Sequence, residues 1–246
     1  SIDEEQNVDV IINGEVVSGK FLAKSPKFDI ALISIKKKDI TEDTKKNIVP
    51  IKLGNSNKST LGSFVISYGE SGDESGIFNY GIISKKSNQS MVDANVTVIN
   101  TNIATSSNDD GLLFDSNGNL LGIGTDMGPD SDTFKVVGIY DIKRHIEKLS
   151  ADIDVVLFGI YGEDITENIA SRYDIPNGVY LTDAAFDSPA YKAGLQSGDI
   201  ITAIDGSEIK SMDDIENILS DYKAGKTMSV DIKRKNKDGF PNRLKS

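Results

Sequence analysis

Short apolar or alternating runs of residues, each bounded by turn signals, fill the first half of this 246-residue chain. They follow one another closely between Val8 and Asp126, with little helical periodicity between them. The dipeptide Asn13-Gly14, between the first two runs, is a strong hairpin signal. Such a succession is typical of an antiparallel sandwich or barrel. The clearest runs are 8–12, 16–23, 30–35, 61–68, 78–84, 96–100, 111–115 and 119–125.

The pattern changes at Tyr140. Ile142, Ile146 and Leu149 follow at helical spacing, which predicts a short helix that closes the β region and leads into a second unit. Ser211, followed by acidic residues, is a plausible cap for a later helix. We therefore predict a mainly β protein with one domain at residues 1–150 and an α+β domain at 151–246. Within the second domain we expect helices at 166–173 and 212–222 and strands at 178–182, 200–204 and 227–234.

Composition excludes several classes of function. The absence of cysteine rules out disulfides, thiol catalysis and Cys-based zinc sites. A formal net charge of −11 argues against a nucleic-acid partner, because phosphate binding needs a basic face. No apolar run is long enough to span a membrane, and the acidic start at Ser1 is no signal peptide. Residues 115–119 imitate the start of a calcium loop, but Leu120 stands where glycine is required, so we expect a hairpin turn there and no metal or cofactor.

The most specific motif is Ser-Pro-Ala-Tyr-Lys-Ala-Gly-Leu-Gln-Ser-Gly-Asp-Ile-Ile-Thr-Ala-Ile-Asp-Gly at residues 188–206. It closely resembles the PDZ signature of bacterial HtrA proteins, and the resemblance runs from about Leu157 to the C-terminus. Each part of the motif predicts a local structure. Ser188 can cap a short helix with Pro189 at its first position, Gly194 can end that helix, and Asp205-Gly206 can turn the chain into the next strand.

This resemblance implies a peptide-binding site. PDZ domains add an extended peptide as a strand beside a sheet edge and hold its C-terminal carboxylate with backbone N–H groups. In HtrA-type PDZ domains the capturing loop is an apolar-Gly-apolar motif before the first strand, and a helix forms the other wall. The alternative is that Phe158 and Ile160 are ordinary core residues. The implied partners are polypeptide C-termini or unfolded proteins, and the implied peptide-binding residues are Leu157, Phe158, Gly159 and Ile160 in the loop and Ile215, Ile218 and Leu219 on the helix.

Residues 8–149 resemble, more loosely, the trypsin-like protease domain of the same family. Ser-Pro-Lys-Phe-Asp-Ile-Ala-Leu-Ile at 25–33 resembles the segment that holds the triad aspartate, which places Asp29 in that position. An acidic residue that opens a strand is also commonplace. Residues 51–56, 61–69 and 80–84 follow the family's later segments. The resemblance implies a trypsin-like double β-barrel whose N-terminal barrel is incomplete in this chain, because its first two strands have no counterpart.

The nucleophile position departs from the family. Where the family carries Gly-Asn-Ser-Gly-Gly, residues 107–111 read Ser-Asn-Asp-Asp-Gly, so Asp109 takes the place of the serine. A triad needs a nucleophile, a base and a group that orients the base. Asp109 would put an anion where an oxyanion must form. The one histidine, His145, is far along the chain from Asp29, whereas the family's base precedes the strand equivalent to 8–12.

We therefore predict an HtrA-like pseudo-protease with a degenerate triad that binds peptides or C-termini through its PDZ domain. Two other hypotheses stay open. One is an active serine endopeptidase of protein quality control, with Ser107 as nucleophile and a histidine upstream of Ser1. The other is a structural barrel whose PDZ groove is closed. The resemblance also implies an extracytoplasmic location, membrane attachment only through an N-terminal anchor outside this chain, and a homo-trimer.

Overall fold

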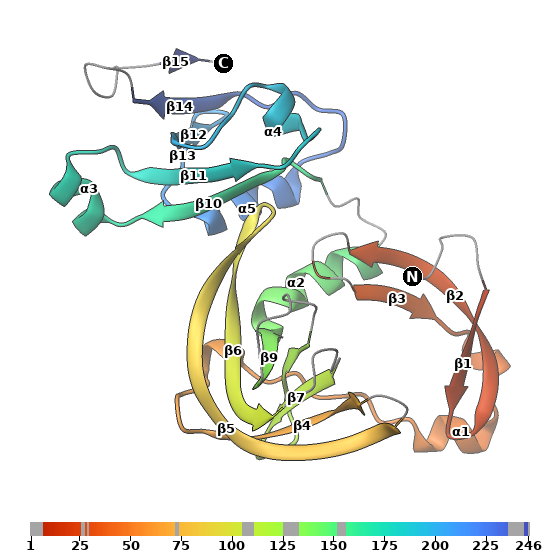
Figure 1. Ribbon diagram of the computed structural model, residues 1–246. Helices are drawn as coiled ribbons and strands as arrows, with labels where there is room; N and C mark the ends of the chain where they lie inside the picture. Colours follow the sequence, from red (N-terminus) through yellow and green to blue (C-terminus); the bar gives the residue numbers. More distant parts are fainter. Residues whose placement is uncertain are drawn as a thin grey trace. The chain divides into compact units, whose positions relative to one another are not determined.

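The computed structural model describes residues 7–25, 28, 30–71, 74–104, 111–124, 133–151, 156–235 and 244–245 (Figure 1). The chain forms two compact units. The first comprises Ser1–Ser87 and Thr97–Ile153, and the second comprises Asn88–Val96 and Asp154–Ser246. A short segment from the middle of the first unit's sequence therefore belongs to the second unit.

The first unit begins with a three-stranded antiparallel sheet in the order β1-β2-β3. Its strands are β1 (Asn7–Ile12), β2 (Glu15–Ser25) and β3 (Ile30–Ser34). The predicted hairpin joins β1 to β2, with Asn13 at φ 50° and Gly14 at φ 81°, the left-handed pair that a tight two-residue turn requires. The 3-10 helices η1 (Lys37–Asp39) and η2 (Ser56–Lys58) and the helix α1 (Glu42–Asn47) follow.

The same unit contains a closed barrel of six strands in the order β4-β5-β6-β9-β8-β7. These are β4 (Phe64–Ser71), β5 (Glu74–Met91), β6 (Ala94–Ala104), β7 (Gly111–Asp115), β8 (Leu120–Ile123) and β9 (Thr133–Gly138). Alternate residues of these strands point inward, so the branched side chains of the predicted runs meet in one core. That core contains Val65, Ile83, Ile99, Ile103, Leu113, Leu121, Phe134 and Val136.

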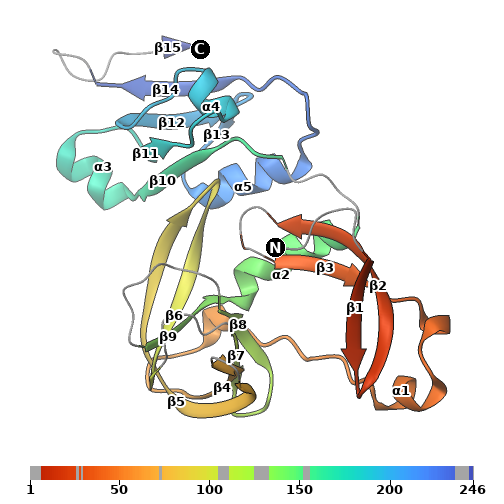
Figure 2. The ribbon, with the colours of Figure 1, turned by 45° about the vertical axis from the view of Figure 1, so that its right-hand side comes forward.

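The predicted helix after Tyr140 is α2 (Ile139–Ser150). Ile142 and Leu149 are buried, as the helical spacing requires. The helix contacts β2 and β3 of the small sheet and also β8 and β9 of the barrel (Figures 1 and 2). It therefore joins the two sheets of the first unit.

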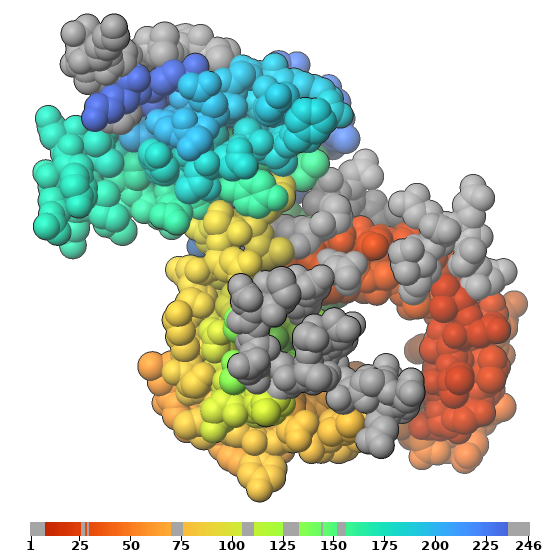
Figure 3. Space-filling model, in the orientation of Figure 1, coloured from red at the N-terminus to blue at the C-terminus, as the bar shows by residue number. Residues whose placement is uncertain are grey.

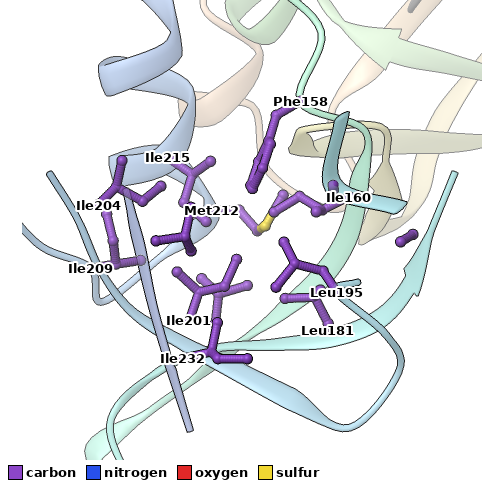
Figure 4. Packing of buried hydrophobic residues seen from close by; sticks show 14 of the residues in the cluster. Phe158, Ile160, Leu181, Leu195, Ile201, Ile204, Ile209, Met212, Ile215 and Ile232 are labelled. Atoms are coloured by element: carbon purple, nitrogen blue, oxygen red, sulfur yellow. The ribbon is translucent and has the colours of Figure 1, made fainter. Parts of the chain in front are cut away.

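The second unit is a sheet in the order β10-β11-β12-β14-β15, with β13 on β12, together with three helices. The sheet strands are β10 (Ile160–Ile165), β11 (Gly178–Ala184), β12 (Asp199–Ile204), β13 (Ser207–Glu208), β14 (Val230–Arg234) and β15 (Leu244–Lys245). The helices are α3 (Glu167–Tyr173), α4 (Pro189–Lys192) and α5 (Met212–Asp221). Side chains from the strands and from α5 interlock in an apolar core (Figure 4), and a smaller cluster of Ile165, Ala170 and Ile200 lies beside α3.

The local signals in the PDZ-like motif are confirmed. The hydroxyl of Ser188 accepts from the Tyr191 N–H at 3.1 Å, with Pro189 at the start of α4. Asp205 and Gly206 have φ values of 48° and 79° at the turn out of β12. The predicted mainly β architecture is confirmed as well, with a closed six-stranded barrel in the first unit and an α+β second unit. Among the described helices, none is both long and apolar enough to cross a membrane.

The start of α5 is closed by a capping box that makes a testable contribution to stability. Ser211 Oγ accepts from the Asp214 N–H, and the Asp214 carboxylate accepts from the Ser211 N–H and from the Lys210 N–H at 2.9 Å each. Burial acts to raise the pKa of Asp214, but these hydrogen bonds outweigh it, and the pKa lies below the ordinary 3.8.

We expect Asp214→Asn to cost about 1 kcal/mol of unfolding free energy at pH 7. A carboxyl whose pKa is lower in the folded state stabilises the fold above its unfolded pKa, and this contribution is lost as the pH falls through the folded value. The difference between variant and wild type should therefore shrink toward zero in acid. Urea unfolding at pH 7 and at acid pH measures it. A difference that stays constant with pH would contradict the assignment.

Candidate functional site

Three successive backbone N–H groups point at one carboxylate immediately before and at the start of β10. The Phe158 N–H donates to Asp93 Oδ2 at 2.8 Å, and the Ile160 N–H donates to Asp93 Oδ1 at 2.9 Å. Between them, the Gly159 N–H lies 2.8 Å from Oδ1 and 3.0 Å from Oδ2. Successive N–H groups of this kind form a concave anion-binding site. Residues 158–160 are called the carboxylate loop below.

The backbone of Gly159 explains why these N–H groups all point to one side. Its φ of 91° lies in the region that favours glycine. The carbonyl groups of Phe158 and Gly159 have other partners: the Ala190 N–H donates to Phe158 O at 3.0 Å, and the Ala185 N–H donates to Gly159 O at 2.8 Å. The hydroxyl of Ser188 also donates to Gly159 O at 3.3 Å. The segment around α4 therefore holds the loop by its carbonyls and leaves its N–H groups for an anion.

The anion in this structure is supplied by the turn between β5 and β6. Asp93 has a φ of 59° and is only 6% exposed. Its own N–H donates to Ile160 O at 2.8 Å. Two residues further along β10, the Gly162 N–H donates to Ser90 Oγ and the Ser90 hydroxyl donates to Gly162 O, both at 3.2 Å. The turn thus lies along the start of β10 (Figures 1 and 3), and we call residues 88–96 the hairpin tip.

Strand β10 is the end strand of its sheet among the described strands. An edge strand presents unpaired N–H and C=O groups to any chain that lies beside it. The helix α5 is close to the same strand, because the Met212 N–H donates to Asp164 Oδ1 at 2.7 Å. A Cβ added at Gly162 would lie 3.1 Å from Met212 Sδ. The carboxylate loop and β10 therefore form the polar side of the site, and α5 packs close to them.

The side chains that the sequence suggested for peptide contact lie mostly inside the second unit. Phe158, Ile160 and Ile215 are buried in its core (Figure 4). Leu219 is buried in the same core, and Ile218 is half-buried against it. Leu157 is 48% exposed. The donors that meet the carboxylate are backbone N–H groups, as capture of a terminal carboxylate requires. Contact of a peptide with these side chains stays a prediction.

Sequence reasoning missed Asp93. Within Met91-Val-Asp-Ala94 it has the character of an ordinary turn residue, since Asp is common in turns and tolerates a positive φ. Nothing local indicates that the carboxylate binds a loop 65 to 67 positions further along the chain. Only the tertiary structure brings the two segments together.

The three candidate catalytic residues, Asp29, Ser107 and Asp109, lie outside the described residues. The structure describes the strands that flank them: β3 begins at Ile30, β6 ends at Ala104 and β7 begins at Gly111. Their catalytic roles therefore stay predictions from the sequence.

His145 lies much closer to the Asp29 segment than its sequence position suggested. It is buried on α2, and its Nε2 is 2.7 Å from Ser25 Oγ, at the end of β2. The Ser25 hydroxyl also accepts from the Phe28 N–H at 3.1 Å, and the Phe28 ring meets the imidazole edge-on at 5.1 Å. These contacts attach α2 to the chain just before position 29. The imidazole therefore helps to attach α2 to the end of β2. The long separation of His145 and Asp29 in the sequence did not indicate this contact.

The suspected calcium-like segment is a hairpin turn between β7 and β8. Asp115 Oδ1 accepts from the Asn117 N–H at 2.9 Å and from the Asn119 N–H at 2.8 Å. Burial acts to raise the pKa of Asp115, but hydrogen bonds from Asn119 and Asn117 outweigh it and lower the pKa below its usual value. In the described part of the chain, no group of three or more His, Cys, Asp or Glu side chains is arranged to hold a metal ion.

Comparison with known proteins agrees with this architecture. Residues 2–123 match the family model of the trypsin-like peptidase domain, and residues 142–239 match that of the PDZ domain. A probable periplasmic serine endoprotease DegP-like of Pseudomonas putida is 26% identical over 231 residues, which cover 90% of this chain and 46% of the relative. The serine protease Do-like HtrA of Lactobacillus helveticus is 25% identical and covers 93% of this chain and 59% of the relative.

A third relative, the probable periplasmic serine endoprotease DegP-like of Chlamydia trachomatis, is 28% identical and covers 92% of this chain. The chain spans about half the length of the curated relatives it matches, 46% to 59% in these three. The solved structure of the HtrA-type protease AlgW with decapeptide shares the fold, with a TM-score of 0.59 at 18% identity, over 95% of this chain and 72% of that chain. The chain therefore combines a segment that matches the trypsin-like peptidase domain with a segment that matches the PDZ domain, and over most of its length it is similar to HtrA-type serine proteases.

Proposed function

We propose that this protein is a pseudo-protease that binds polypeptides by their C-terminal carboxylate. The carboxylate loop holds the terminal carboxylate, and the edge of β10 pairs with the peptide backbone. The single observation that carries this proposal is the convergence of the N–H groups of Phe158, Gly159 and Ile160 on one carboxylate. The AlgW structure, described as a complex with decapeptide, supports a peptide as the ligand class.

A titration with two peptides tests the binding proposal. A fluorescently labelled peptide with an apolar C-terminal residue is offered once with a free carboxylate and once as the C-terminal amide. Because charge-assisted hydrogen bonds are about twice as strong as neutral ones, the amide should bind at least tenfold more weakly. Equal affinity of the two peptides would show that the terminal carboxylate does not contribute to binding. No binding of either peptide to any variant of the chain would remove the function.

The absence of protease activity rests on Asp109 at the serine position. An anion at that position would oppose the negative charge of a tetrahedral intermediate, and its oxygens would compete for the backbone donors that stabilise such an intermediate. We expect no labelling by a fluorophosphonate probe, tested on a form that includes any residues upstream of Ser1. Labelling that disappears in Ser107→Ala would instead support the active serine endopeptidase.

One observation favours a second candidate function. The carboxylate loop is already occupied by Asp93, as expected for a structural barrel with a closed PDZ groove. Under this hypothesis the contact serves only to attach the hairpin tip to the rest of the second unit. It predicts that peptides fail to bind even when Asp93 is removed.

The proposed location is extracytoplasmic. Two of the relatives are named periplasmic endoproteases, which supports a cell-envelope or secreted protein. Fractionation of cells that express the natural protein tests this location.

A further inference from the structure

We propose that Asp93 is a built-in competitor for the carboxylate loop, so that a peptide binds only after displacing the hairpin tip. This inference rests on the proposed function, because it assumes that the loop binds peptide carboxylates. It concerns the regulation of that site by a residue of the same chain.

The contacts of Asp93 reproduce those that a C-terminal residue would make. A terminal residue presents a carboxylate together with its own backbone N–H, and Asp93 presents the same two groups. Its carboxylate accepts from the N–H groups of Phe158, Gly159 and Ile160, and its N–H donates to Ile160 O at 2.8 Å. A backbone ligand at this edge strand pairs with every second residue. The second contact is made here by the side-chain hydroxyl of Ser90, which bonds to both the N–H and the C=O of Gly162.

Simultaneous occupation by a peptide is excluded by the number of donors. The loop offers three N–H groups, and all three donate to Asp93. Asp93 is only 6% exposed, so the place beside the loop is filled. A second carboxylate there would lack donors and would face a like charge at short range. Binding of a peptide therefore requires Asp93 to leave.

The tether makes Asp93 an effective competitor. Because the hairpin tip belongs to the same chain, its effective concentration at the loop lies in the range of about millimolar or above. The apparent Kd of an outside peptide equals its intrinsic Kd divided by the fraction of molecules with a vacant loop. A tip that occupies the loop nine times in ten would thus weaken peptide binding about tenfold.

Three variants separate this competition from other effects of the substitution. Asp93→Ala removes the competing carboxylate, and Asp93→Asn removes its charge but keeps its shape. Asp174→Asn is the matched control, because Asp174 is also an aspartate with a positive φ, of 50°, in the second unit, but it is exposed at the end of α3. Asparagine tolerates this backbone conformation, so the control reports the backbone effect alone.

The measurement is the Kd of the labelled peptide with a free carboxylate, on the full chain, by fluorescence anisotropy. We expect Asp93→Ala to bind at least tenfold more tightly than the wild type, Asp93→Asn to lie between them, and Asp174→Asn to match the wild type. The C-terminal amide should bind weakly to all four proteins.

The outcomes distinguish the inference from the function on which it rests. If Asp93→Ala and the wild type bind the free-carboxylate peptide with equal affinity, the loop binds peptides, but the inference that Asp93 competes with them is wrong. If no protein, Asp93→Ala included, prefers the free carboxylate to the amide, the proposed function itself fails.

A second measurement needs no substitution at Asp93 and guards against a variant that folds poorly. In the wild type, saturation with the peptide should shift the amide resonances of Ser90 and Asp93 as strongly as those of the carboxylate loop. Peptide binding that leaves the resonances of Ser90 and Asp93 in place would overturn the competition.

Discussion

Gly159→Ala is expected to abolish carboxylate binding and to destabilise the second unit by about 2 to 4 kcal/mol. Two effects add. At φ 91° alanine is strained, and its methyl group would overlap the Cβ and Oγ of Ser188, whose side chain caps α4. Relief of that overlap turns or moves the loop, so its N–H groups no longer converge. Peptide titration and urea unfolding of the second unit measure the two consequences.

Gly194→Ala is the matched control for this substitution. Gly194 has a similar φ of 82°, but a Cβ there would have no atom within 4 Å. Its replacement reports the cost of the backbone conformation alone, about 1 kcal/mol, and should leave peptide binding intact. If Gly159→Ala cost no more than Gly194→Ala and still bound peptide, the close packing on Ser188 would have no role in shaping the site.

Arg234→Ala is expected to lower the unfolding free energy of the second unit by about 3 to 5 kcal/mol. Asp199, at the start of β12, is fully buried, and Arg234 on β14 holds both of its oxygens, at 2.6 Å and 2.7 Å. Arg234 Nη2 also donates to Gly194 O at 2.9 Å. The hydrogen bond to Asp199 raises the pKa of Arg234, and burial opposes it. Removal of the guanidinium leaves a buried carboxylate without its cation, which is the costly case.

An exposed pair in the same unit gives the comparison. Lys192 and Asp187 are 3.0 Å apart, with side chains 62% and 73% exposed. Because water screens such a pair, Lys192→Ala should cost at most about 1 kcal/mol. Urea unfolding monitored on the second unit compares the two variants. Equal losses would show that burial of Asp199 does not set the cost. Combining Asp199→Asn with Arg234→Ala should recover part of the loss, since no buried charge then remains.

Much of the fold follows from local patterns. The short β runs, the helix after Tyr140 and the capped start of α5 were predictable because alternation, helical spacing and capping side chains act over a few residues. The sequence did not reveal α1, whose residues Glu42–Asn47 are polar and show no apolar face. It is capped by Thr41, and the Thr41 N–H and hydroxyl both donate to the Glu15 carboxylate on β2. The sequence pattern also underestimated the length of β5, which was expected over 78–84 and is found over Glu74–Met91.

The extra length of β5 is polar as well. Residues 85–90, near its end, carry no alternation of apolar side chains, so their strand conformation depends on pairing with a neighbour rather than on burial. This polar extension forms one side of the hairpin tip. The part of the chain that carries Asp93 to its partner is therefore the part with the weakest sequence signal.

The sequence, through its resemblance to HtrA-type PDZ domains, predicted which loop would bind a peptide carboxylate. Phe158-Gly159-Ile160 before a strand, with the Ser188-Pro189 helix start behind it, is a local arrangement, and local backbone geometry follows from glycine, proline and capping side chains. Only the tertiary structure decided what occupies that loop. Asp93 reaches it because β5 and β6 extend to a turn that lies beside β10, and this depends on contacts between residues more than 60 positions apart. No local pattern encodes such a contact, because its free energy comes from buried, charge-assisted hydrogen bonds that exist only once both segments have folded.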